Sequence, residues 1–113
     1  MEKQPSSRTC VLCGRQNPIS LRMTWYNDAD AGRVRATVVV PEHFNGYPGI
    51  VHGGIVAAIL DETAGRAVML DGDSDNLMVT LKLEVKYHAP TPTATPLEVA
   101  GWVVRGGRSR AQV

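Results

Sequence analysis

A single segment with helical periodicity constrains this chain more than any other feature. Between residues 53 and 70, GGIVAAILDETAGRAVML, the bulky apolar side chains recur at intervals of three and four, as in an amphipathic helix. The remaining segments alternate apolar and polar residues over short runs bounded by turn formers, which is typical of strands. We therefore expect an α+β domain in which a mostly antiparallel sheet packs against one long helix.

The expected strands follow from this alternation. Residues 77–88, LMVTLKLEVKYH, show it most clearly, and the turn-forming DGDSDN at 71–76 separates them from the helix. Further strands are expected at 21–26 and 33–40, which form a hairpin, and at 97–104. The last four residues, RAQV, begin another strand but are too few to complete it. We therefore expect the given sequence to lack part of the C-terminal sheet.

The charge balance excludes some classes of partner. The chain has 12 basic and 11 acidic residues, a net charge of +1, so no nucleic-acid partner is expected. No apolar run approaches the roughly 18 residues of a membrane span, and the polar N-terminus lacks the apolar core of a signal peptide. We expect a cytoplasmic protein without a membrane partner. One domain should cover residues 21–113, after an N-terminal tail and loop at 1–20 that is loose over its first nine residues.

The two sides of the helix differ in composition. At about 100° per residue, the side expected to face the sheet carries Ile55, Val56, Ile59, Leu60, Thr63, Ala67 and Leu70. Asp61 stands on the other side among Gly54, Ala57, Ala58, Ala64, Gly65 and Val68. Such small residues leave room for a second helix or a ligand to approach, although a structural role for Asp61 stays open. Glu62 is expected to form a surface ion pair with Arg66, four residues further on.

The start of the helix is the second candidate site. The first N–H groups of a helix lack partners within it, and a Ser, Thr, Asp or Asn residue often caps one of them. Here the helix follows His52 and begins with Gly53 and Gly54, so we expect free donors at the positive end of the helix dipole. Such donors suit a polarised carbonyl or an oxyanion. The alternative is a tight turn with an ordinary loop histidine.

A distance separates these two candidate features within one chain. At about 1.5 Å of rise per residue, Gly53 and Asp61 are about 12 Å apart along the axis and cannot contact the same carbonyl group. If both serve one reaction, they come from two chains. Antiparallel helices in a homodimer would place Asp61 of one subunit near the start of its partner's helix, giving two equivalent sites.

The run NGYPGIVHGGIVAAILDETAG, followed by TLKLEVKYHAP, resembles the hotdog-fold thioesterases that hydrolyse acyl-CoA, in particular the phenylacetate-degradation type. The resemblance implies a curved antiparallel sheet around one central helix. It also implies that Asn45 and His52 hold the thioester and that the Gly53 N–H polarises its carbonyl. Asp61 of the partner subunit would be the general base or the nucleophile, and Thr80 would support the attacking water. No cofactor or metal is implied.

Other residues are weaker candidates. Val51 and Gly54, beside the start of the helix, are expected to contact substrate. Arg105 and Arg108 in RGGRSR could meet the phosphates of coenzyme A, or they could lie in a solvated turn. Cys10 and Cys13 have the CxxC spacing of half a zinc site, but a second ligand pair does not follow, so a metal would need a distant ligand or a second chain. A structural role is the simpler expectation.

Three alternatives to a homodimeric or homotetrameric acyl-CoA thioesterase remain. The first is a non-catalytic acyl-CoA or acyl-carrier binding module on the same fold, against which Asp61 argues. The second is a small zinc-ribbon-like interaction protein that uses Cys10 and Cys13. The third is a hotdog-type hydratase, but the sequence does not show the Asp and His on one short loop-helix segment that such enzymes carry.

Overall fold

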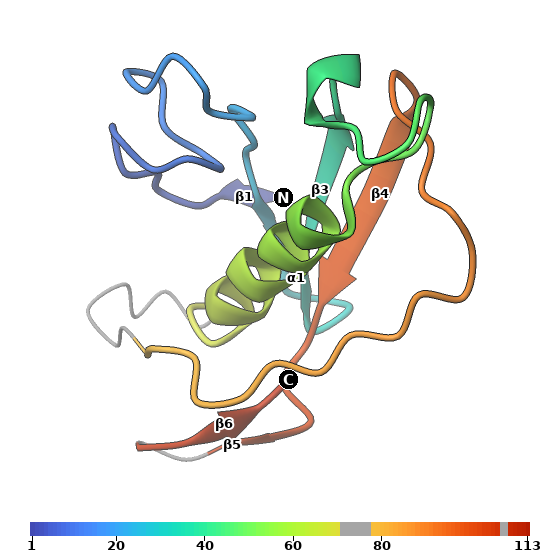
Figure 1. Cartoon of the computed structure of the whole chain (residues 1–113). Helices are drawn as coiled ribbons and strands as arrows, with labels where there is room; N and C mark the ends of the chain where they lie inside the picture. Colours follow the sequence, from blue (N-terminus) through green and yellow to red (C-terminus); the bar gives the residue numbers. More distant parts are fainter. Residues whose placement is uncertain (71–77, 107–108) are drawn as a thin grey trace.

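The computed structural model describes residues 1–70, 78–106 and 109–113, and it has the α+β architecture expected (Figure 1). Four antiparallel strands form the main sheet in the order β1 (Glu2–Lys3), β2 (Tyr26–Asp28), β3 (Arg33–Val39) and β4 (Pro96–Gly101). The helix α1 (Gly53–Ala67) packs against β3 and β4. A short 3-10 helix, η1 (Glu42–Phe44), lies between β3 and α1. A separate two-stranded ribbon pairs β5 (Arg105–Gly106) with β6 (Ala111–Gln112).

The core lies between the sheet and α1. Val34, Ala36 and Val38 alternate along β3 and are buried, as a strand with one covered face requires. Ile59 and Ala67 of α1 are buried with them, and Ile55, Val56 and Leu70 pack at the edge of the same cluster. Each fully buried Val or Ile contributes about 1.5–3 kcal/mol, so this face holds the helix in place. The expectation that the bulky side of the helix faces the sheet is confirmed, although Leu60 is partly exposed.

The N-terminal residues were expected to form a loose tail, and this is wrong. Glu2 and Lys3 pair with β2 as the edge strand β1. Gln4 is buried, and its side-chain amide donates to Asn27 Oδ1 at 2.6 Å and to the Arg66 carbonyl at 3.0 Å. These polar contacts connect residues far apart in sequence, and no periodic apolar pattern indicates them.

The strand expected at 21–26 is displaced. Regular pairing begins only at Tyr26, because Leu21 and Met23 are held by the preceding loop and not by a neighbouring strand. Leu21 and Met23 donate backbone hydrogen bonds to the carbonyls of Val11 and Leu12. Trp25 is nevertheless fully buried, so the alternation correctly indicated which side chains face the core.

The strand expected at 77–88 is the main error in the predicted secondary structure. Residues 78–88 form no strand in the described part of the chain, and they pass beside α1 before the chain returns to β4 (Figure 1). Val79 and Leu81 have exposed fractions of 94% and 89%. A strand needs a neighbour that accepts and donates its backbone hydrogen bonds, and this segment has none among the described residues. The alternation was correctly recognised, but it does not provide a pairing partner.

The ion pair between Glu62 and Arg66 is present, but it is not on the surface. The Arg66 Nη2 lies 3.9 Å from Glu62 Oε1, and the arginine side chain is only 7% exposed because residues 1–25 cover it. The expected break at 71–76 lies outside the described residues. The later strand ends at Gly101, not at Val104. Over the part of the chain that the structure describes, no helix is both long and apolar enough to cross a membrane.

Candidate active site

A compact loop delivers the chain to the start of α1. Asn45 forms an antiparallel bridge with Val51, and the backbone N–H of His52 donates to the Phe44 carbonyl at 3.0 Å. The turn between them includes Gly49 at φ +79°, a conformation that favours glycine. The loop therefore places Asn45 and His52 side by side at the start of the helix, as both were expected to be.

Glu42 holds this loop together and was missed in the sequence analysis. Its Oε1 accepts hydrogen bonds from the Gly49 N–H at 2.8 Å and from Asn45 Nδ2 at 3.1 Å, and its Oε2 accepts one from Thr93. The Thr93 hydroxyl, then the Gly49 and Asn45 donors, lower the pKa of Glu42 below its ordinary value. The PEHFNGYPG run gave no periodic signal for this role, because the partners come from turns and from the segment before β4.

The start of α1 is capped, contrary to expectation. His52 Nδ1 accepts a hydrogen bond from the Gly54 N–H at 2.9 Å, so the imidazole takes the part that Ser, Thr, Asp or Asn usually plays. The Gly54 N–H is therefore not a free donor. A Cβ at position 54 would lie 3.1 Å from His52 Nδ1, which explains why glycine suits this position. Within the described residues, the Gly53 N–H has no hydrogen-bond acceptor and remains the available donor.

Tyr87 is a second residue that sequence reasoning did not assign to the site. Its hydroxyl donates to the Gly53 carbonyl at 2.7 Å, which places the phenol ring beside the start of α1. A Cβ at Gly53 would meet the Tyr87 ring at 3.6–3.7 Å, an ordinary contact. Tyr87 and Thr80 both reach α1 although a regular strand would turn them to opposite faces, and the bend at Leu81 accounts for this.

Asp61 and Thr80 form the other half of the candidate site. The Thr80 hydroxyl donates a hydrogen bond to Asp61 Oδ1, which brings together two residues selected from the sequence. Asp61 is half-buried, and its neighbours on the helix, Ala64 and Gly65, are half-buried as well. A Cβ at Gly65 would have no atom within 4 Å among the described residues. Space is therefore available beside Asp61, and its Oδ2 is not used by Thr80.

The two halves do not meet within one chain. Gly53 is the first residue of α1 and Asp61 is the ninth, so they stand about 12 Å apart along the helix. The structure thus brings together Asn45, His52 and Gly53 at one position and Asp61 with Thr80 at another. One thioester carbonyl cannot contact both positions.

The expected substrate contacts have different surroundings. Val51 is buried in the core cluster, so its side chain supports the loop. Arg105 is exposed on β5, and Arg108 lies outside the described residues. A surface hollow of about 910 Å³ is lined mainly by residues of β2, β3 and β4, among them Arg35, Thr37 and Glu98. No residue of α1 lines it, so it is separate from the candidate site.

Comparisons with known proteins agree on one family. The family model described as the thioesterase superfamily matches residues 48–113. The acyl-coenzyme A thioesterase THEM4 of Rattus norvegicus is 40% identical over 50 residues, which cover 44% of this chain and 20% of that protein. The Mus musculus protein of the same name is 38% identical over 50 residues, with the same coverage. The match thus spans about a fifth of the length of these curated relatives.

A crystal structure of a thioesterase superfamily protein superposes with a TM-score of 0.79 at 32% identity. The superposition covers 88% of this chain and 47% of that one. One long helix on an antiparallel sheet, a glycine-rich helix start and a half-buried mid-helix aspartate define a hotdog-fold protein of the thioesterase class. Because the family model covers more than half of the chain, this protein belongs to the thioesterase superfamily.

Proposed function

We propose that the protein hydrolyses an acyl-CoA thioester to a carboxylic acid and coenzyme A, in a site shared by two copies of the chain. One observation carries the proposal. The half-buried Asp61, hydrogen-bonded to Thr80, lies on the same helix as the available Gly53 N–H but too far away to contact the same thioester carbonyl. An antiparallel second copy would bring each feature opposite the other.

The proposed chemistry uses each group once. The Gly53 N–H of one subunit donates to the thioester oxygen and stabilises the negative charge that develops there. Asp61 of the other subunit accepts a proton through Oδ2 from a water that attacks the carbonyl carbon. The C–S bond then breaks, and the coenzyme A thiolate takes up the proton that Asp61 accepted, which restores the carboxylate as the acid leaves. Thr80 keeps the carboxylate oriented by its hydrogen bond to Oδ1.

The exposed apolar segment supports the second copy. Residues 78–88 present Val79, Leu81 and part of Leu83 to solvent directly after the part of the chain that carries Asp61. Exposed apolar side chains gathered on one segment mark an interaction surface more often than isolated ones do. A second copy that covered them would lie on the same side of α1 as Asp61, because Thr80 belongs to the same segment.

The first test measures thiol release from a panel of acyl-CoA thioesters. We expect Asp61→Asn to lower kcat by about 10²–10⁴-fold, the usual contribution of a general base. Asp30→Asn is the matched control, because it makes the same chemical change at an exposed turn residue. Turnover near the wild-type level in Asp61→Asn would contradict the role of the carboxylate. An inactive wild-type protein that still binds acyl-CoA would instead favour the binding-module alternative.

The second test addresses the start of the helix. Gly53→Pro removes the proposed carbonyl donor, and proline is tolerated at the first position of a helix. His52 already has φ −55° and ψ 134°, values that a residue before proline adopts readily. We expect a fall in kcat of about 10²–10³-fold, as for loss of one oxyanion donor. Gly53→Ala keeps the N–H and should retain most of the activity.

A further inference from the structure

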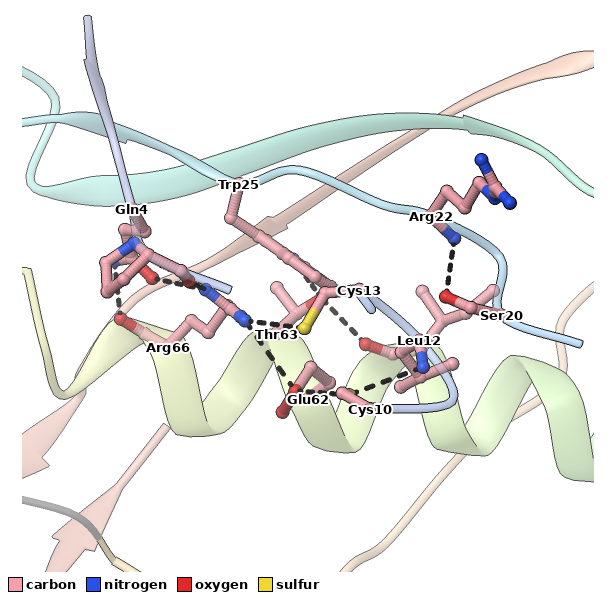
Figure 2. A network of polar contacts seen from close by, with 12 residues as sticks. Gln4, Cys10, Leu12, Cys13, Ser20, Arg22, Trp25, Glu62, Thr63 and Arg66 are labelled. Carbon is pink, nitrogen blue, oxygen red and sulfur yellow. Dashed lines mark hydrogen bonds and ion pairs between the residues drawn. The ribbon is translucent and has the colours of Figure 1, made fainter. Parts of the chain in front are cut away.

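The CxxC loop meets a carboxylate on the side of α1 that faces away from Asp61. Cys10, Cys13 and Glu62 each offer one ligand atom, and the three atoms lie within 4.8 Å of one another (Figure 2). The sequence alone showed only half of a metal site, and a distant ligand was the missing requirement. Glu62 is such a ligand, 49 residues after Cys13 in the chain.

We propose that Cys10, Cys13 and Glu62 bind a zinc ion, with water as the fourth ligand. This site goes beyond the proposed thioesterase activity and does not depend on it. Two thiolates and one carboxylate are a donor set that zinc accepts in a tetrahedral arrangement. Binding displaces the two thiol protons, which leave to solvent, and forms two Zn–S bonds and one Zn–O bond.

The ligand spacing fits such an ion. Zinc binds sulfur at about 2.3 Å and carboxylate oxygen at about 2.1 Å, so a tetrahedral angle separates S and O by roughly 3.6 Å. Cys10 Sγ and Glu62 Oε1 are 3.6 Å apart. Cys13 Sγ lies within 4.8 Å of both atoms, so a movement of at most about 1 Å would bring it to a tetrahedral S···S spacing near 3.8 Å.

The loop is built to present both sulfur atoms. The Gly14 N–H donates to the Cys10 carbonyl at 2.9 Å and closes the CVLCG turn. A Cβ at Gly14 would lie 2.6 Å from that same carbonyl oxygen, so only glycine fits. The Leu12 N–H points at Cys10 Sγ at 3.4 Å and helps fix the position of that sulfur atom.

Arg66 supplies the positive charge that balances the proposed zinc site. Two thiolates, a carboxylate and Zn²⁺ carry one net negative charge together, and the permanently charged guanidinium beside them neutralises it. Its Nη2 donates to Cys13 Sγ at 3.1 Å, and the group lies over the Trp25 ring, 4.3 Å from the centroid (Figure 2). Cys13 is buried while Cys10 and Glu62 are partly exposed, so solvent has access to the fourth position.

The test uses the full chain, purified with a reductant and loaded with zinc. We expect one tightly held zinc per chain by elemental analysis. Cobalt in its place should give the thiolate-to-cobalt charge-transfer band and the strong visible bands of a tetrahedral ion. Failure of the reduced wild-type protein to retain zinc, or a cobalt spectrum without thiolate bands, would overturn the proposal.

Single variants locate the ligands. Glu62→Gln and Cys10→Ser alter partly exposed positions. Each should weaken zinc binding, measured by competition with a chromophoric chelator. Loss of a residue that only supports a ligand costs about 10–100-fold in metal affinity, and loss of a ligand itself should cost more. Glu98→Gln, an exposed carboxylate on β4, is the matched control. Zinc should raise Tm for the wild type and for Asp61→Asn, but not for Glu62→Gln. Unchanged affinity in Glu62→Gln would remove the carboxylate from the site and contradict the inference.

Discussion

The two long sides of α1 differ in the hydrogen bonds and packing that the rest of the chain provides to them. We call the side with Glu62, Thr63 and Arg66 the closed flank, because residues 1–25 cover it, and the side with Asp61 the open flank. On the closed flank, Trp25 Nε1 donates to Thr63 Oγ1 at 3.0 Å, and Arg66 Nη1 donates to the Pro5 carbonyl at 2.6 Å. On the open flank, the described residues 78–88 reach α1 through only two hydrogen bonds, from Thr80 and Tyr87.

This difference separates stability from the proposed function. Thr63 and both terminal nitrogens of Arg66 find partners within the chain, although the buried Arg66 Nε has none among the described residues, so substitutions on the closed flank should act on folding. Side chains of the open flank leave apolar surface and one carboxylate oxygen free, so substitutions there should act on assembly and turnover. Each of the following predictions would sharpen or break this contrast.

The largest effect on stability is expected for Trp25→Ala. The Trp25 side chain is fully buried between Thr63 and Arg66, and its removal leaves a large cavity and takes away the N–H that donates to the Thr63 hydroxyl. We expect a loss of about 3–5 kcal/mol in the free energy of unfolding, measured by denaturant titration. Trp102→Ala is the control, because Trp102 is half-exposed and should matter much less. Equal losses in the two variants would argue against a closed flank.

A smaller effect is expected for Gln4→Ala. The variant removes the donor to Asn27 Oδ1 and to the Arg66 carbonyl, and it leaves both acceptors buried. Such a loss costs about 1–3 kcal/mol in the free energy of unfolding. Deleting residues 1–5 should lower the stability at least as much. Unchanged stability in both variants would show that the N-terminal residues do not hold the closed flank.

On the open flank, Leu81→Lys should change assembly more than folding. Leu81 is 89% exposed in the single chain, so its replacement should alter the intrinsic stability of the domain by less than about 0.5 kcal/mol. If a second copy covers this side chain, the added charge would have to be buried, and the dimer should dissociate. Light scattering after size-exclusion chromatography measures the mass. A dimer that survives the substitution would place the interface elsewhere.

The smallest effect is a dependence on pH at the loop before α1. Hydrogen bonds from Thr93, Gly49 and Asn45 lower the pKa of Glu42. A group with a lowered folded-state pKa stabilises the fold above its ordinary pKa, and this contribution is lost as the pH falls through the lowered value. Glu42→Gln should therefore be less stable than the wild type at neutral pH, and the two should converge in acid. Thermal unfolding of both proteins across this pH range checks the prediction. A difference in Tm that stays constant with pH would contradict it.

The sequence predicts which side chains form the core better than it predicts the polar contacts of the closed flank. Periodicity located α1 and indicated that Ile59 faces the sheet, because burial follows a repeat that is visible in one chain, and β-branched residues located β3. The contacts of Gln4 and Arg66 cross about sixty residues and follow no repeat. Polar partnerships of this kind depend on the fold itself and could not be inferred in advance.

For the candidate site, the sequence indicated candidate residues better than it indicated their hydrogen-bond partners and their secondary structure. Thr80 donates to Asp61, and Asn45 lies in the segment that pairs with the residues before α1, while the catalytic roles of all these residues stay predictions. The cap formed by the imidazole was missed, since histidine is an unusual cap and its ring must turn back onto the Gly54 N–H. The prediction of a strand at 77–88 was wrong for a different reason. A strand is a property of two segments, and the alternation in one of them gives no information about the other.

The most direct test of the shared site mixes two inactive variants. Asp61→Asn and Gly53→Pro chains are unfolded together, refolded at equal amounts and assayed for thiol release. In each mixed dimer one site has both an intact Gly53 N–H and an intact Asp61, so about a quarter of the wild-type activity should return. If both groups served one site within a single chain, the mixture would stay as inactive as its parents, and that result would contradict the account.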